Sequence, residues 1–142
     1  DFLVNREWKE ADEETARCIF KVAGLKENNS LRAEDIENFP CTDLRTIDQL
    51  WVKYSNGKFG FSVQKKIYYN LGGTKEYNEK AWKEFADKVG WRKGQKWLYY
   101  SDLEFNISTH YTGHLPSRVR WSKMWWFVGG VILFSRAETC GL

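Results

Sequence analysis

The residue types best suited to bind a ligand gather in one basic and aromatic segment, residues 90–100. Trp51, Trp82 and Phe85 lie at helical spacing, whereas Trp97, Tyr99 and Tyr100 do not. Such rings can stack on the face of a large, flat, partly apolar anion, while guanidinium and ammonium groups meet its carboxylates. We interpret these three rings as ligand contacts or as packing residues, and the sequence favours neither. The segment's basic side chains are Arg92, Lys93 and Lys96.

The sequence offers little evidence of a metal site or a catalytic site. His110 and His114 lie four residues apart, but in a glycine-containing loop rather than on a helix face, which disfavours a metal site. The sequence contains no nucleophile elbow, phosphate loop or dinucleotide fingerprint. We therefore expect a protein without a cofactor or a metal, and not an enzyme.

The cysteines are three in number and include no short-spaced pair: Cys18, Cys41 and Cys140. This pattern argues against a disulfide framework and against a structural metal, and it favours a reducing compartment. The chain starts at Asp1 without a charged and apolar leader, so we expect an excised domain or a mature product.

Length and charge point to one domain with an anion-attracting half. The 142 residues are 42% hydrophobic and 29% charged, which suffices for one hydrophobic core. The net charge of +3 divides into −5 over residues 1–48 and +8 over residues 49–142. The longest apolar run, residues 124–134, is shorter than the roughly 20 residues of a membrane span. One acidic cluster is predicted to be a solvated helix face: Glu10, Asp12, Glu13 and Glu14.

Apolar residues at three- and four-residue spacing predict an all-α fold, with no convincing pair of strands. The predicted helices span residues 6–23, 31–38, 42–54, 62–71 and 77–89. Ser30, Thr42 and Ser62 are the predicted N-caps of the second, third and fourth helices. A short extended piece is predicted within residues 99–107. The sequence thus predicts a single compact helical domain with long aromatic loops.

The same spacing assigns other rings and apolar residues to the core. Trp51, Trp82 and Phe85 lie on helix stripes, and Phe59 and Phe61 flank a glycine between two helices. We expect all five rings to pack inside the protein. In the fourth predicted helix the expected inward residues are Val63, Ile67 and Leu71, with Lys65 and Lys66 facing out.

Residues 39–64 carry a family resemblance, in the stretch FPCTDLRTIDQLWVKYSNGKFGFSVQ. This stretch resembles the signature of the genomes-uncoupled-four family, the porphyrin-binding regulators of magnesium chelatase in oxygenic phototrophs. Supporting matches extend the resemblance over residues 8–116. They are Trp8, Glu10-Ala11-Asp12 and Thr15 in the first helix, then Val89-Gly90-Trp91, Trp97, Phe105 and Gly113-His114-Leu115-Pro116.

The resemblance implies a helical domain shaped like a cupped hand over residues 1–116, which binds protoporphyrin IX or its magnesium derivative in its concave face. It implies mobile loops at residues 25–38, with Leu31 and Ile36, and at residues 91–103, where Tyr100 aligns with a tryptophan important for binding in some relatives. Arg118 and Arg120 are the nearest matches to arginines that contact the ligand's carboxylates.

The resemblance also implies a function in chlorophyll biosynthesis. Family members stimulate magnesium chelatase through its large, porphyrin-binding subunit and have no established catalytic centre. The implied location is the plastid stroma or the cyanobacterial cytoplasm, and we expect a monomer. The N-terminal helical domain of cyanobacterial relatives is absent from this sequence.

Apart from Arg118 and Arg120, residues 117–142 match no feature of the family that can be assigned, and two interpretations stay open for them. They could form a tail or extra helix folded back on the bundle. Alternatively, Trp125, Trp126 and the apolar run could contact a partner or the surface of a plastid membrane.

Two other functions compete with porphyrin binding. The basic and aromatic segment could be a stacking platform for single-stranded nucleic acid, although the acidic first helix and the lack of a nucleic-acid motif argue against this. The chain could instead be a pure protein-interaction domain. Binding of nucleic acid is therefore not expected.

Overall fold

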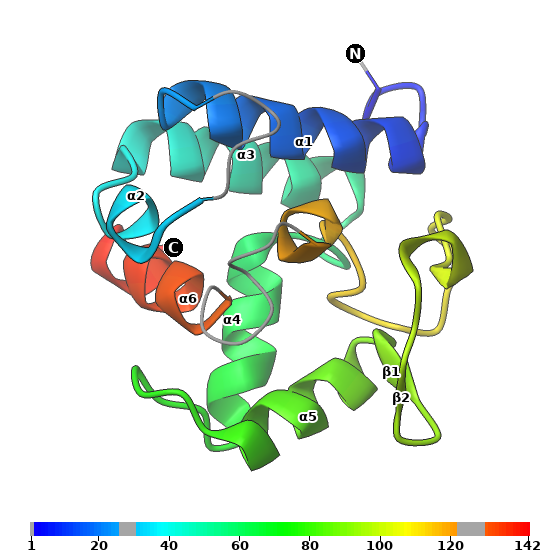
Figure 1. Cartoon of the computed structure of the whole chain (residues 1–142). Coiled ribbons are helices and arrows are strands. Elements are labelled where there is room, and N and C mark those ends of the chain that lie inside the picture. The colour runs from blue at the N-terminus through cyan, green and yellow to red at the C-terminus, as the bar shows by residue number, and fades with distance from the viewer. Residues whose placement is uncertain (1, 26–30, 122–129) are drawn as a thin grey trace.

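The computed structural model describes residues 2–25, 31–121 and 130–142, without the side chains of residues 120 and 121. Helices dominate these residues, which confirms the all-α prediction (Figure 1). In chain order the elements are α1 (Trp8–Val22), α2 (Ala33–Glu37), α3 (Cys41–Tyr54), α4 (Phe61–Asn70), α5 (Glu79–Lys88), β1 (Arg92–Lys93), β2 (Lys96–Trp97), the 3₁₀ helices η1 (Tyr100–Asp102) and η2 (Arg118–Trp121), and α6 (Gly130–Thr139).

The 3₁₀ helix η2 lies near the centre of the molecule and packs against α1 (Figure 1). Helices α1 and α3 lie together on one side, and the indole N–H of Trp51 donates a 2.9 Å hydrogen bond to the hydroxyl of Thr15 between them. Helix α4 packs on α5 and α6, and α6 also packs on α2. The strands and η1 lie at the far side of the molecule from α2 (Figure 1). The fold therefore places α2, from the implied loop at residues 25–38, far from the implied loop at residues 91–103.

Helix α4 begins one residue earlier than predicted, and a side chain from another helix caps it. The predicted cap, Ser62, lies inside the helix, and its backbone N–H donates a 2.8 Å hydrogen bond to Oδ1 of Asp48 in α3. The preceding Gly60 has a φ of 135°, and a Cβ there would lie 2.9 Å from the same oxygen. Tertiary packing thus replaces the local cap.

Two other predicted caps also differ from the structure. Helix α3 begins at Cys41 after Pro40, so Thr42 lies inside the helix. The proline has a φ of −59°, which suits the start of a helix. Ser30 lies outside the described residues.

The buried face of α4 corrects the prediction for this helix. Its buried residues are Phe61, Gln64 and Tyr68, whereas Val63 and Ile67 are only half-buried. Gln64 is inside because its amide donates hydrogen bonds of 3.0 and 2.8 Å to the carbonyls of Gly113 and Pro116. A polar residue therefore occupies a core position because a loop from distant sequence supplies its acceptors.

A small hairpin replaces the loop expected after α5. Strands β1 and β2 are antiparallel, with Arg92 opposite Trp97 and Lys93 opposite Lys96. Gly94 and Gln95 between them have φ values of 55° and 66°, the left-handed pair that a two-residue hairpin turn requires. Part of the predicted extended piece at 99–107 is instead η1.

The five rings assigned to the core are all buried, which confirms that prediction. Trp51 and Phe59 pack with Trp8 at centroid distances of 6.2 and 5.5 Å from its ring. Trp82 and Phe85 stack at 5.2 Å in a second cluster. Phe61 belongs to a third cluster under α6.

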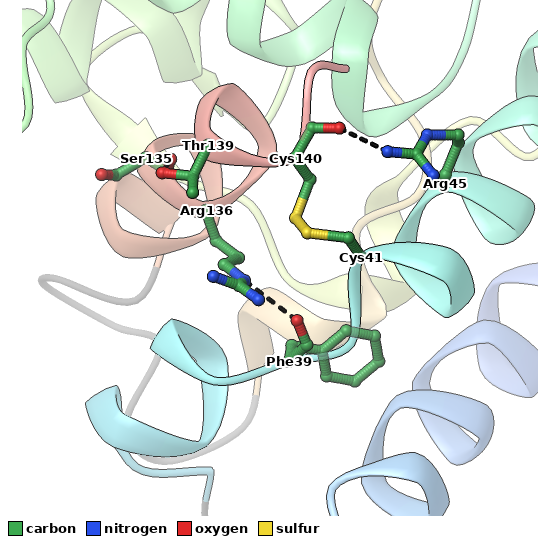
Figure 2. The surroundings of a disulfide bond; sticks show 7 residues. All are labelled: Phe39, Cys41, Arg45, Ser135, Arg136, Thr139 and Cys140. Carbon is green, nitrogen blue, oxygen red and sulfur yellow. Dashed lines mark hydrogen bonds between the residues drawn. A yellow bond between two sulfur atoms is a disulfide. The ribbon is translucent and has the colours of Figure 1, made fainter.

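The cysteine prediction is wrong for two of the three cysteines. Cys41 and Cys140 form a disulfide across 99 residues, with Cα atoms 5.2 Å apart, and Cys18 is the free thiol (Figure 2). Their proximity arises because α6 folds back against α2 and α4, and residue spacing carries no record of that packing. The inference of a reducing compartment loses its basis accordingly. Trp125 and Trp126 lie outside the described residues.

Candidate functional site

The structure brings together two of the predicted ligand residues, Tyr100 and Arg118. Tyr100 begins η1 and Arg118 begins η2, and the guanidinium carbon of Arg118 lies 4.8 Å from the centroid of the tyrosine ring. The ring is half-buried and the arginine is exposed. A ring and a cation in this arrangement attract each other, and the pair places an exposed positive charge over a half-buried ring.

Asp12 of α1 holds this pair in place. The hydroxyl of Tyr100 donates a 2.9 Å hydrogen bond to Oδ2 of Asp12, and the backbone N–H of Arg118 donates to its two oxygens at 3.0 and 3.1 Å. Ser117 adds its backbone N–H at 2.8 Å and its hydroxyl at 2.9 Å. One carboxylate thus ties α1 to both 3₁₀ helices, which are about ninety and one hundred residues away in sequence.

The burial of Asp12 corrects its assignment to a solvated acidic face. The residue is fully buried, while Glu10 is exposed. Asp12 lies four residues after Trp8 and three before Thr15, both of which are buried on the inner face of α1. That spacing was the signal in the sequence that could have placed Asp12 inside.

Burial also controls the protonation of this network. It raises the pKa of Asp12 above the ordinary 3.8, and the hydrogen bonds from Arg118, Ser117 and Tyr100 oppose the rise. Burial and the neighbouring Asp12 carboxylate raise the pKa of Tyr100, so its hydroxyl stays protonated and remains a donor.

A pH titration with the Asp12→Asn variant will test whether burial raises the pKa of Asp12. Because the folded-state pKa of Asp12 is raised, the folded protein holds the proton more tightly than the unfolded chain. The contribution of Asp12 to the free energy of unfolding is therefore greatest below about pH 4 and falls as the pH rises through the raised pKa. We expect the stability of the wild type minus that of Asp12→Asn, measured by urea unfolding, to decrease from pH 4 to pH 7. An increase over that range would contradict the raised pKa.

The other two predicted rings differ from Tyr100. Tyr99 is 76% exposed, and its backbone N–H donates a 3.1 Å hydrogen bond to Asp102 within η1. Trp97 in β2 is half-buried and packs against the cluster of α5 rings. Tyr99 is therefore the ring most open to a ligand, while Trp97 serves partly as a support for the hairpin.

The basic residues of the segment at residues 90–100 also differ in exposure and in ion pairing. Arg92 forms a 3.0 Å salt bridge with Asp87, and only 13% of its side chain is exposed. Lys93 lies 3.6 Å from Glu104 with half of its side chain exposed, and Lys96 is exposed. Positive charge open to an anion thus comes from the two lysines and Arg118.

The remaining predicted site residues are not brought to this surface. Leu31 and Ile36 are 0% and 3% exposed and belong to the core cluster under α6. Figure 1 shows α2, which contains Ile36, on the opposite side of the molecule from η1. The side chain of Arg120 lies outside the described residues.

An apolar cavity of about 20 Å³ lies between α4, α5, α6 and the segment at residues 116–119. Its walls include the rings of Phe61, Trp82, Trp91 and Phe134. Ligand sites for molecules of drug size or larger occupy roughly 300–1,000 Å³. A macrocycle therefore cannot occupy this cavity in the conformation described.

The two histidines differ in their burial and in their hydrogen bonds. His114 is buried, its Nε2 accepts from the backbone N–H of Glu104 at 2.9 Å, and its Nδ1 donates to the carbonyl of Val89 at 2.7 Å. His110 is exposed. Among the described residues no group of three or more His, Cys, Asp and Glu side chains could hold a metal ion. No helix in the described part of the chain is both long and apolar enough to cross a membrane.

Fold and surface together define a class: a mostly helical domain that presents rings and cations beside one another on loop segments. The chain belongs to the GUN4-like family, whose model matches residues 1–130. GUN4 stands for the genomes-uncoupled-four family, so the resemblance found in the sequence is confirmed. It extends to residue 130, beyond the limit of residue 116 expected from the sequence.

Relatives and solved structures agree with this membership. The chain is 40% identical over 116 residues to Uncharacterized protein ycf53 of Porphyra purpurea, covering 80% of this chain and 46% of that protein. It is 34% identical over 93 residues to the chloroplastic Tetrapyrrole-binding protein of Arabidopsis thaliana, covering 64% and 32%. The chain thus spans less than half the length of these curated relatives.

The fold is shared with two solved GUN4 structures. The ligand-free structure of Arabidopsis thaliana GUN4 matches with a TM-score of 0.72 and 26% identity, covering 96% of this chain and 89% of that one. GUN4 from Chlamydomonas reinhardtii matches with a TM-score of 0.71 and 28% identity, covering 98% and 83%.

Proposed function

We propose that this chain binds protoporphyrin IX or magnesium protoporphyrin IX and activates magnesium chelatase through the large, porphyrin-binding subunit of that enzyme. The observation that carries the proposal is the Tyr100–Arg118 pair, held in place by the buried Asp12. Family membership supports the ligand, because an Arabidopsis relative is named for tetrapyrrole binding. The proposed location is the plastid stroma or the cyanobacterial cytoplasm, where the protein acts as a monomer.

The chemistry of a porphyrin matches the surface. Its flat, apolar ring system can stack on an exposed ring such as Tyr99, while its two propionates meet Arg118, Lys93 and Lys96. The ring contact supplies most of the affinity because exposed ion pairs contribute only about 1 kcal/mol or less. Since the enclosed cavity is too small, the ligand lies on the open surface or the loop segments move to admit it.

Two variants test the binding surface. Tyr99→Ala removes a ring that is 76% exposed, so we expect porphyrin binding to weaken by about 1–2 kcal/mol with little change in melting temperature. Arg118→Ala removes an exposed cation and should cost about 1 kcal/mol, less at high salt. Tryptophan fluorescence quenching and the Soret band will report both affinities.

Lys53→Ala provides the matched control. Lys53 also places its cation over a tyrosine, 5.2 Å from the ring centroid of Tyr54, but at the end of α3. Its removal should leave the porphyrin affinity unchanged. If Tyr99→Ala and Arg118→Ala bind as tightly as Lys53→Ala, this surface is not the porphyrin site.

The regulatory half of the proposal needs reconstitution with purified chelatase subunits. We expect the chain alone to insert no magnesium into protoporphyrin, because the described residues of the candidate site are argued above to bind the ligand and none is assigned a catalytic function. Added to the chelatase, it should raise the rate most at low porphyrin concentration. Magnesium insertion by the isolated chain would contradict a purely regulatory function, and the absence of stimulation would leave only the binding claim.

A further inference from the structure

The C-terminal helix is fastened to the start of α3 by a set of contacts that we call the α6 latch. Its covalent member is the disulfide between Cys140, which directly follows α6, and Cys41, the first residue of α3 (Figure 2). Beside it, Nη2 of Arg45 donates a 2.7 Å hydrogen bond to the carbonyl of Cys140. Nε of Arg136 donates one of 2.9 Å to the carbonyl of Phe39.

Helix α6 covers two parts of the core, so the latch controls their access to solvent. Leu133 and Ala137 pack in the cluster that contains Ile36 of α2. Phe134 packs in the cluster that contains Trp82 of α5, and it lines the 20 Å³ cavity. Outward movement of α6 would therefore expose α2 and enlarge the ring-lined cavity.

The two sulfur atoms belong to residues of unequal burial. Cys140 is 5% exposed, whereas Cys41 is half-buried and lies between the exposed residues Pro40 and Thr42. Cys41 is therefore the residue of the pair that an incoming thiolate reaches more readily. A disulfide that can be reached in this way is of the labile kind.

We propose that Cys41–Cys140 is a reversible modification site for a dithiol reductant, and that its reduction unlatches α6. A thiolate of the reductant attacks Sγ of Cys41, the S–S bond breaks, and Cys140 leaves as a thiolate that takes up a proton. The second thiol of the reductant then attacks the mixed disulfide and releases Cys41. Two electrons pass to the protein, which gains two thiols, and the dithiol becomes a disulfide.

Residues around the disulfide favour this exchange, and the contacts that hold α6 after it are non-covalent. The guanidinium of Arg45 places positive charge beside the backbone carbonyl of Cys140, the residue whose sulfur departs as a thiolate. Once the bond is broken, only non-covalent contacts hold the helix end, among them the 2.7 Å salt bridge of Lys65 with the largely exposed Glu138. Local opening of α6 then becomes more frequent without unfolding of the whole domain.

The test uses the full chain with Cys18→Ser, so that the disulfide supplies the only thiols. The protein is incubated with dithiothreitol or with thioredoxin and its reducing system, without denaturant, and then alkylated for thiol counting by mass spectrometry. We expect two thiols per chain. Hydrogen exchange of residues 131–140 should accelerate at least tenfold, and that of α1 less than twofold. Oxidised glutathione should restore slow exchange.

Two further variants separate the disulfide from the rest of the latch. A Cys41→Ser, Cys140→Ser pair in the same background should show fast α6 exchange without any reductant. Arg136→Gln in the oxidised protein removes the guanidinium that bonds to the carbonyl of Phe39 but leaves the disulfide intact, and it should change that exchange less than threefold. Should the double variant not fold, the reduced Cys18→Ser protein supplies the same comparison.

The proposal is overturned by either of two results. One is that thiols appear only when denaturant unfolds the protein, and the other is that reduction leaves α6 exchange unchanged. Neither readout involves porphyrin, so these results are independent of the function proposed above.

Discussion

Asp12→Ala is expected to lower the free energy of unfolding by about 4 kcal/mol, since stranding a buried donor costs about 1–3 kcal/mol and several donors lose their acceptor at once. These donors are the hydroxyls of Tyr100 and Ser117 and the backbone N–H groups of Ser117 and Arg118. Urea unfolding will measure the loss. We also expect weaker porphyrin binding, because Tyr100 and Arg118 lose their common anchor.

Asp12→Asn is the control for this result. The amide keeps an oxygen that accepts from the two backbone N–H groups, and its NH₂ group can donate to the hydroxyl oxygens of Tyr100 and Ser117. We therefore expect a loss of only about 1–2 kcal/mol for this variant. A loss below about 1 kcal/mol for Asp12→Ala would mean that the network contributes little to stability.

His114→Leu is expected to cost about 3 kcal/mol of stability, because the carbonyl of Val89 and the N–H of Glu104 lose their partners in the interior. The two histidines lie four residues apart, which makes His110→Leu a matched control. His110 is exposed, and its substitution should change the stability by no more than about 0.5 kcal/mol. Thermal and urea unfolding of both variants will measure the two changes in stability. Equal effects would show that the contacts of His114 are energetically unimportant.

The helices and much of the core could be predicted from the sequence, because both depend on a period that repeats locally. Trp51 and Leu44 are seven residues apart in α3, and both are 0% exposed as their helical spacing requires. Trp82 and Phe85 are likewise buried on one face of α5. The family motif is local in the same sense, since it is a continuous stretch of residues.

The site was predicted only in part. Tyr100 and Arg118 were singled out separately, but their contact at 4.8 Å follows from a third residue, Asp12, that was assigned to the solvent. Leu31 and Ile36 were predicted to contact the same ligand from the other loop, and both lie in the core in this structure. A ring outside a helical period can face either way, and its direction depends on partners from other elements.

The sequence by itself therefore determined the class of fold, the family and five rings of the core. Only the tertiary structure decided which distant groups hydrogen-bond to Asp12, that Gln64 takes a core position and that Cys41 meets Cys140. Each of these outcomes joins residues that are tens of positions apart, and for Cys41 and Cys140 the separation is 99. Helical and strand periods report only on neighbours within a few residues, whereas buried polar groups and disulfides depend on which distant segments pack together.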